Sequence, residues 1–142
     1  MGLLLVNAVA VLVMTGVIWF VQIVHYPLFA GVGDDAWGAY HRAHTRRTTW
    51  VVAAPMAVDL VSSIALVAAR PDGVGAAAVV IGAVLAAVTW AATGLVAIPA
   101  HDRLGRGWDA RTARRLLGAN AVRTAAYSAH AAVVVAMLAA AA

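Results

Sequence analysis

The chain has 142 residues, of which 64% are hydrophobic and only 11% are charged, and its formal net charge is +4. A soluble domain of this size has no core large enough for so much apolar surface, so this composition excludes a water-soluble fold. Every basic residue is arginine, every acidic residue is aspartate, and cysteine is absent. These absences exclude a lysine Schiff base, a cysteine nucleophile, a thiolate metal site and a four-glutamate di-iron centre.

Four apolar segments are long enough to cross a bilayer, which needs about 20 residues of helix. Pro27 and Pro99 are expected to close the first and third segments, and a tight turn at 70–73 joins the second to the third. The sequence therefore predicts an all-α membrane protein, a single domain over 1–142 folded as a four-transmembrane-helix bundle. The segments are about 3–28, 48–69, 74–100 and 114–141.

The remaining connections, 29–47 and 101–113, are predicted to be loops on the same side of the membrane. In the first, Asp34 or Asp35 is expected to cap a short interfacial helix. The arginines in or directly after these loops are Arg42, Arg46, Arg47, Arg103, Arg106, Arg111, Arg114 and Arg115. Only Arg70 lies in the opposite turn. By the positive-inside rule both loops are cytoplasmic and both termini lie outside, in a bacterial-type inner membrane.

The expected partners follow from the same distribution of charge. The arginines lie between apolar segments and form no basic face on a soluble domain, so nucleic acid is not an expected partner. Membrane lipids and a small-molecule substrate are expected instead. The many alanines and glycines let helix backbones approach closely, which suits a compact bundle and equally a homo-oligomer.

Polar residues recur at helical spacing in each predicted span. The fourth span shows this best, with Asn120, Arg123, Tyr127 and His130 on one helical face. Lipid cannot satisfy polar groups, so these faces should turn toward one another. The bundle is therefore predicted to have a polar interior.

The same reasoning groups four histidines at the cytoplasmic end. His41 and His44 lie on adjacent turns of one helix, and His25 and His101 lie at the ends of two others. Imidazoles in this arrangement favour a transition-metal site, with copper or iron foremost and zinc as an alternative. Interfacial histidines that meet headgroups are the competing explanation. Haem held between two of the histidines is a further alternative, and it requires a facing pair at equal depth.

Three polar residues inside the spans are candidate catalytic residues. Asp59 is expected near the middle of the membrane and could handle protons, whereas Asn120 and Arg123 could orient a substrate or stabilise developing negative charge. A purely structural contact between Asp59 and Arg123 is given the same weight as these functional roles. A proton relay between His130 and Asp59 is a lesser hypothesis.

Residues 98–101 (IPAH) and 116–124 (LLGANAVRT) resemble the anthrone-oxygenase-like (DUF1772) family of small four-helix membrane proteins. The matching positions are Pro99, the leucine-rich approach to the fourth helix, and Arg123 with Thr124. That family commonly has an asparagine after the proline and a histidine before the Arg-Thr pair, where this chain has His101 and Asn120. The resemblance implies an oxygen-using enzyme that acts on an aromatic, polyketide-like substrate.

The leading hypothesis from the sequence is therefore a membrane-embedded, metal-dependent oxidoreductase or oxygenase acting on a small hydrophobic or aromatic substrate. Its metal ligands would be His25, His41, His44 and His101. Two alternatives from other classes stay open: a non-enzymatic binding or transport component, and a small subunit of a larger membrane complex.

Overall fold

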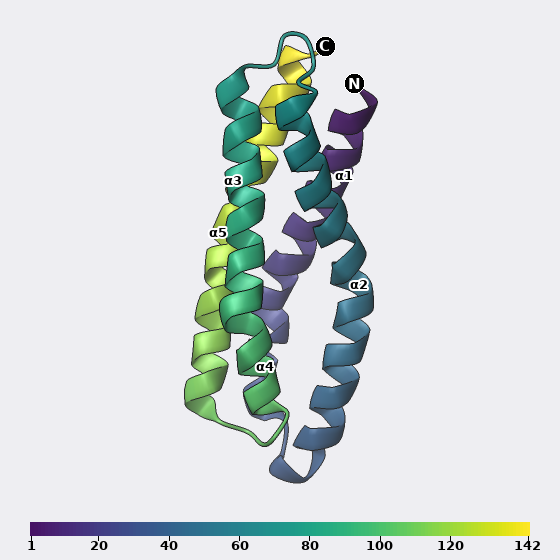
Figure 1. Ribbon diagram of the computed structural model, residues 1–142. Helices are drawn as coiled ribbons and strands as arrows, with labels where there is room; N and C mark the ends of the chain where they lie inside the picture. The colour runs from purple at the N-terminus through teal and green to yellow at the C-terminus, as the bar shows by residue number, and fades with distance from the viewer.

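The computed structural model describes residues 1–142 and contains helices but no strand. Four long helical segments form an elongated bundle (Figure 1). Each segment is long and apolar enough to cross a membrane, which confirms the predicted four-helix fold and is compatible with an integral membrane protein. The elements are α1 Gly2–Phe20, η1 Val21–His25, η2 Pro27–Gly31, α2 Asp34–Ala68, α3 Ala76–Ala92, η3 Thr93–Ala97, α4 Ile98–Leu104 and α5 Ala110–Ala140.

The connection predicted at 29–47 is mostly helix and not loop. The first segment continues to Gly31, and α2 begins at Asp34 and runs without a break to Ala68. Gly33 occupies the N-cap position, so neither aspartate caps the helix as expected. Asp34 and Asp35 instead lie in the first turn, where negative charge complements the partial positive charge of the helix N-terminus. This long α2 places the two histidines of its first part inside the bundle.

The two prolines that were expected to end helices are accommodated by wider turns. The π-helical segments η1 and η3 precede Pro27 and Pro99, and the Tyr26 N–H donates to the Val21 carbonyl at 3.0 Å, an i to i−5 bond. A π turn shifts the hydrogen-bond ladder just before a residue that lacks an N–H and would clash with the preceding turn. The chain therefore continues to α4, and His101 stays in helical register.

The bundle has two distinct ends (Figure 1). Both termini and the turn between α2 and α3 lie at one end, whereas the connections from η2 to α2 and from α4 to α5 lie at the other. We call the latter the basic end, because the arginines other than Arg70 and Arg123 lie in or near it. α1 and α3 each pack against both α2 and α5. The outer surface is rich in exposed valine, leucine and isoleucine, as a lipid-facing surface requires.

Candidate functional site

Four histidines from three separate helical segments meet at the basic end. His41 and His44 come from α2, His25 from η1 and His101 from α4. His41 Nε2 lies 3.2 Å from His101 Nδ1, and His25 Nε2 lies 2.7 Å from His44 Nδ1. The His44 and His101 ring centroids are 5.3 Å apart, so the two pairs adjoin. The structure thus brings together all four histidines that the sequence singled out.

The two pairs differ in their fit to a metal ion. Two nitrogens on one ion at about 2.0–2.1 Å and a tetrahedral angle lie about 3.3 Å apart. Both pairs are hydrogen-bonded in this structure. The 3.2 Å between His41 Nε2 and His101 Nδ1 also matches the separation of two ligands, whereas the 2.7 Å between His25 and His44 is too short for it. No group of three or more histidine or aspartate side chains has the full arrangement of a metal site. A metal would therefore require a third side chain to turn toward the His41–His101 pair.

The surroundings of the histidines orient two of the rings. The Tyr26 hydroxyl lies 3.0 Å from His101 Nε2, on the far side of the ring from His41. His44 Nδ1 contacts both His25 and the Thr48 hydroxyl, at 2.7 and 3.1 Å. The other nitrogen of His44, Nε2, is buried and has no hydrogen-bond partner. His44 Nε2 is therefore the free nitrogen available as a third ligand.

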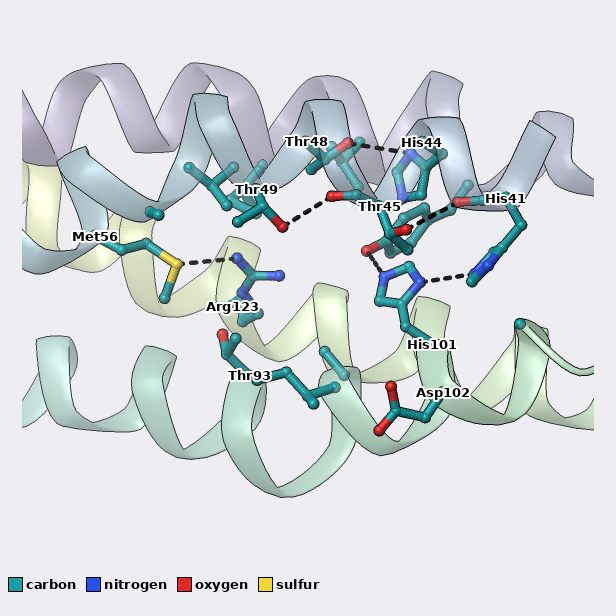
Figure 2. Close-up of a pocket in the computed structure, with 18 of the residues that line it drawn as sticks. His41, His44, Thr45, Thr48, Thr49, Met56, Thr93, His101, Asp102 and Arg123 are labelled. Carbon is teal, nitrogen blue, oxygen red and sulfur yellow. Dashed lines mark hydrogen bonds between the residues drawn. The ribbon is translucent and has the colours of Figure 1, made fainter. Parts of the chain in front are cut away.

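Three of these histidines line a cavity of about 660 Å³ between α2 and the α3–η3–α4 segment (Figure 2). His41, His44 and His101 lie at its end nearest the basic end, whereas His25 lies in a separate shallow groove. The rest of the wall is formed by threonine hydroxyls and apolar side chains. These include Thr45, Thr48, Thr49, Thr93, Val52, Met56 and Trp90.

Arg123 enters this cavity from α5. The residue is only 5% exposed, although it carries a formal charge. Its Nη2 lies 3.7 Å from the Met56 sulfur, and its Nε has no hydrogen-bond partner. Figure 2 shows the guanidinium group between Met56 and the histidines, and Arg123 lines the cavity. The cavity thus combines imidazole nitrogens with one buried cationic side chain.

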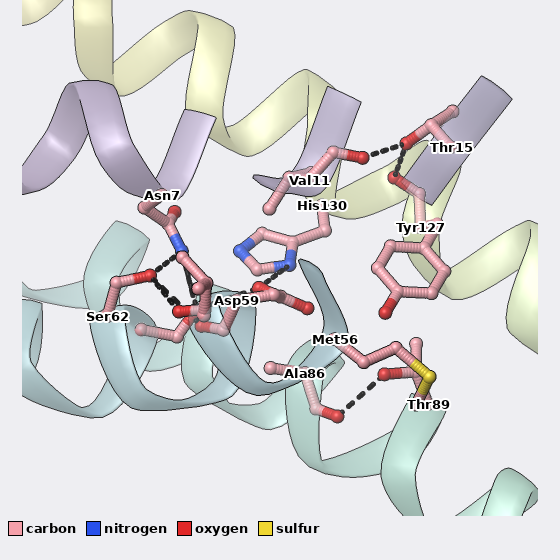
Figure 3. Close-up of polar contacts among 12 residues, drawn as sticks. Asn7, Val11, Thr15, Met56, Asp59, Ser62, Ala86, Thr89, Tyr127 and His130 are labelled. Atoms are coloured by element: carbon pink, nitrogen blue, oxygen red, sulfur yellow. Dashed lines mark hydrogen bonds and ion pairs between the residues drawn. The ribbon is translucent and has the colours of Figure 1, made fainter. Parts of the chain in front are cut away.

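Asp59 does not pair with Arg123, which corrects the structural alternative considered from the sequence. Its Oδ1 lies 3.5 Å from His130 Nδ1 and accepts a hydrogen bond of 3.2 Å from the Ser63 hydroxyl (Figure 3). The side chains of Asp59 and His130 are 0% and 1% exposed, and neither residue lines the cavity. They face each other because α2 and α5 are diagonal neighbours and Gly82 of α3 leaves room for the imidazole. A Cβ at Gly82 would lie 3.0 Å from His130 Nε2.

Asn120 also lies away from the cavity. Its amide donates to the Gln22 side-chain oxygen at 2.8 Å and to the Ile18 carbonyl at 3.3 Å. Both partners belong to the first helical segment, so Asn120 joins α5 to it. The three candidate catalytic residues are therefore separated, and only Arg123 reaches the cavity.

Trp90 and the threonines of α2 were not among the candidate site residues, yet they line the cavity. A signal for the threonines was present in the sequence. Thr45 and Thr48 follow His41 and His44 by four residues each, which places them on the same helical face. Comparisons of the chain with protein-family models, curated proteins and solved structures found no match.

Proposed function

We propose that the chain is a membrane-embedded, metal-dependent oxidoreductase that acts on a small hydrophobic or aromatic substrate. The observation that carries this proposal is the His41–His101 pair. Its two ring nitrogens lie 3.2 Å apart, the separation of two ligands on one ion, and both residues line a cavity large enough for a small molecule.

The proposed ligands are His41 Nε2, His101 Nδ1 and His44. His44 completes the set by a side-chain rotation that turns its unpartnered Nε2 toward the other two. His25 lies outside the cavity and hydrogen-bonds His44, so its role in the proposal is to orient His44. Tyr26 does the same for His101. Such outer contacts fix the tautomer and direction of a ligand ring.

Copper and iron are the metals that suit both the ligands and the reaction. Imidazole binds copper, iron and zinc, but zinc has no redox chemistry. A bound copper or iron ion would supply the one-electron steps of an oxidation, of the oxygen-using kind that the resemblance implies. Haem fits less well, because its two axial nitrogens must lie about 4 Å apart, twice a metal–nitrogen bond. The facing pairs here are 3.2 and 2.7 Å apart.

The protein's own contribution is to hold the substrate. Arg123 is the buried charged side chain placed to contact it, in a cavity whose apolar wall includes Val52 and Trp90. Asp59 and Asn120 do not line the cavity, so the proposal gives them no contact with substrate. They join helices instead.

In the membrane, the proposal places the basic end and the histidines on the cytoplasmic side of a bacterial-type inner membrane.

Metal content of the purified protein tests the proposal. Wild type reconstituted with copper or iron should hold about one ion per chain, and His41→Ala or His101→Ala should lose it. His25→Ala should keep the ion but bind it about 10–100-fold more weakly, because only the orientation of His44 is lost. His130→Asn, a histidine substitution far from the cavity, is the matched control and should bind as wild type does.

Equal metal binding by wild type and both ligand variants would contradict the proposal. Equal loss in His25→Ala and His41→Ala would replace the three-ligand assignment by a four-histidine site. Each variant is first checked for monodispersity in size-exclusion chromatography, so that misfolding is not read as ligand loss.

A second candidate function is a non-enzymatic membrane protein that binds a small anion, and the unpaired Arg123 favours it. The cavity does not include the Asp59–His130 pair, and Ile18 and Met56 of its wall belong to an apolar cluster with Met14 and Tyr127. A single chain therefore holds its ligand at one end, and a transport role would require a homo-oligomer or partner subunits. Unchanged binding of a small anion after removal of metal would favour this candidate.

A further inference from the structure

The guanidinium of Arg123 is a buried cation without a counterion. The only approaches of a basic nitrogen to a carboxylate oxygen within 4.0 Å are Arg103–Asp109 and Asp59–His130, and neither involves Arg123. Met56 sulfur is a weak, neutral acceptor, and it is the single side-chain acceptor that Arg123 meets. Burying a charge in this way is costly unless an opposite charge or strong acceptors compensate.

The neighbouring wall of the cavity does not supply that compensation. None of the hydroxyls of Thr45, Thr49 and Thr93 accepts a hydrogen bond from Arg123, whose one hydrogen-bond contact is Met56. Each donates to a backbone carbonyl one turn earlier, at 2.7–3.2 Å. Asp102 lines the cavity but is exposed and forms no ion pair with Arg123. Two further arginines, Arg42 and Arg106, also line the cavity. The wall therefore carries an excess of positive charge, which attracts an anion.

The apolar part of the cavity wall determines the chemistry of the rest of the ligand. Ile18, Val52, Trp90 and Ile98 provide apolar surface beside the guanidinium. A volume of about 660 Å³ lies within the range of sites that take small organic molecules. Inorganic anions would leave this apolar surface unfilled. An organic molecule with one acidic group satisfies both parts of the wall.

We infer that the cavity binds an apolar organic carboxylate, with the carboxylate against the Arg123 guanidinium and the apolar body against Val52 and Trp90. The inference rests on the proposed function in taking this cavity as the substrate site, and it adds the substrate's chemical class. Planar guanidinium and carboxylate groups form paired, charge-assisted hydrogen bonds. Arg123 has donors to spare for such a contact, because its Nε has no partner and its Nη2 meets only the Met56 sulfur.

Binding of a matched pair of probes tests this inference. The probes are 1-naphthoate and its neutral analogue 1-naphthalenemethanol, titrated by calorimetry into the detergent-purified protein as isolated and after chelation. Wild type should bind the acid at least about tenfold more tightly than the alcohol, as expected for a hydrogen-bonded charge. Arg123→Met should abolish that preference, and Arg123→Lys should retain part of it.

Arg114→Met removes an exposed arginine of the same helix and should bind both probes as wild type does. Decanoate is titrated in parallel. Tighter binding of decanoate than of 1-naphthoate would identify the ligand as a flexible acid drawn from the bilayer, and the reverse would identify it as a rigid aromatic acid. Equal affinity of wild type for 1-naphthoate and 1-naphthalenemethanol would overturn the inference. So would an unchanged acid preference in a monodisperse Arg123→Met or Arg123→Gln protein.

The result is separable from that of the metal experiment. Selective, Arg123-dependent binding of the acid by a protein that binds no metal would uphold the inference while the oxidoreductase proposal fails. Metal bound through His41 and His101, with no acid preference, would uphold the proposed function and overturn the inference.

Discussion

Two charged side chains lie deep inside the bundle and are held in different ways. Asp59 contacts polar groups through one oxygen, because Ser63 donates to its Oδ1 and His130 Nδ1 lies 3.5 Å from the same atom. Asn7 extends this network by donating to the hydroxyls of Ser62 and Ser63, each at 2.9 Å. Arg123 instead faces a cavity with no acid beside it. The first arrangement joins α1, α2 and α5, and the second leaves a cation available to a ligand.

Substitution of Asp59 should therefore change stability more than ligand binding. Asp59→Leu removes the acceptor for Ser63 and the partner of His130, which should lower the free energy of unfolding by about 1–3 kcal/mol. Asp59→Asn keeps an acceptor oxygen and should cost less. Reversible unfolding in mixed micelles measures both, with the turn variant Asp72→Asn as the control. Loss of 1-naphthoate binding in a stable Asp59→Asn protein would show instead that Asp59 acts at the cavity.

At the scale of the element, Asp109 fixes the beginning of α5. Its carboxylate accepts hydrogen bonds from the Arg111 and Thr112 N–H groups and from the Thr112 hydroxyl. These bonds hold the pKa of Asp109 below its ordinary value, with the Thr112 hydroxyl as the largest cause and the nearby Arg103 charge as a smaller one. Asp109 is thus an N-cap that is stronger when ionised.

The pH dependence of this cap has a definite sign. Because folding lowers the pKa of Asp109, its contribution is fully present above the ordinary aspartate value of about 4 and is lost as pH falls through the lower folded value. The protection factors of the first α5 amides, which are exchange rates corrected for the intrinsic effect of pH, should therefore fall in acid. Asp109→Ala should show low protection at every pH, and Asp72→Ala should match wild type. Protection in wild type that stays high and constant through this pH range would count against the cap.

The π-helical segments show how two elements reach the site. η1 ends at His25, and η3 lies one turn before His101. A shifted hydrogen-bond ladder before each proline rotates the following residues relative to a regular α-helix. Both segments thereby help to set the direction from which His25, Tyr26 and His101 approach α2.

At the scale of the whole molecule, the arrangement of arginines predicts how the bundle sits in a membrane. The basic end should face the cytoplasm and both termini should lie outside. Since the chain has no cysteine, a single-cysteine variant reports which side of the membrane that residue faces, without labelling at any other position of the chain. In intact bacterial cells, a membrane-impermeant maleimide should label Ala142→Cys but not Arg114→Cys. The reverse labelling would invert the orientation and place the cavity on the outer side.

Much of this architecture follows from sequence properties that act locally. The lengths of the apolar segments predict four spans, and the rise of about 1.5 Å per residue predicts the depth of each polar group. That depth alone brings His25, His41, His44 and His101 to one end. The sequence predicted a short interfacial helix capped by Asp34 or Asp35, but it missed that this helix runs without a break into the second span. Hydropathy marks where a chain enters lipid and not where its helix begins.

The sequence by itself determined the fold class, the basic end and the depth of each histidine, because these depend on hydropathy, charge and helical rise. Tertiary structure alone decided which polar groups meet. Asp59 pairs with His130 and not with Arg123, since rotation about each helix axis depends on close packing against segments distant in the chain. One such constraint is Gly82, which has no side chain and so leaves room for the His130 ring. The same packing leaves Arg123 alone beside the histidines, at the cavity for which a function is proposed.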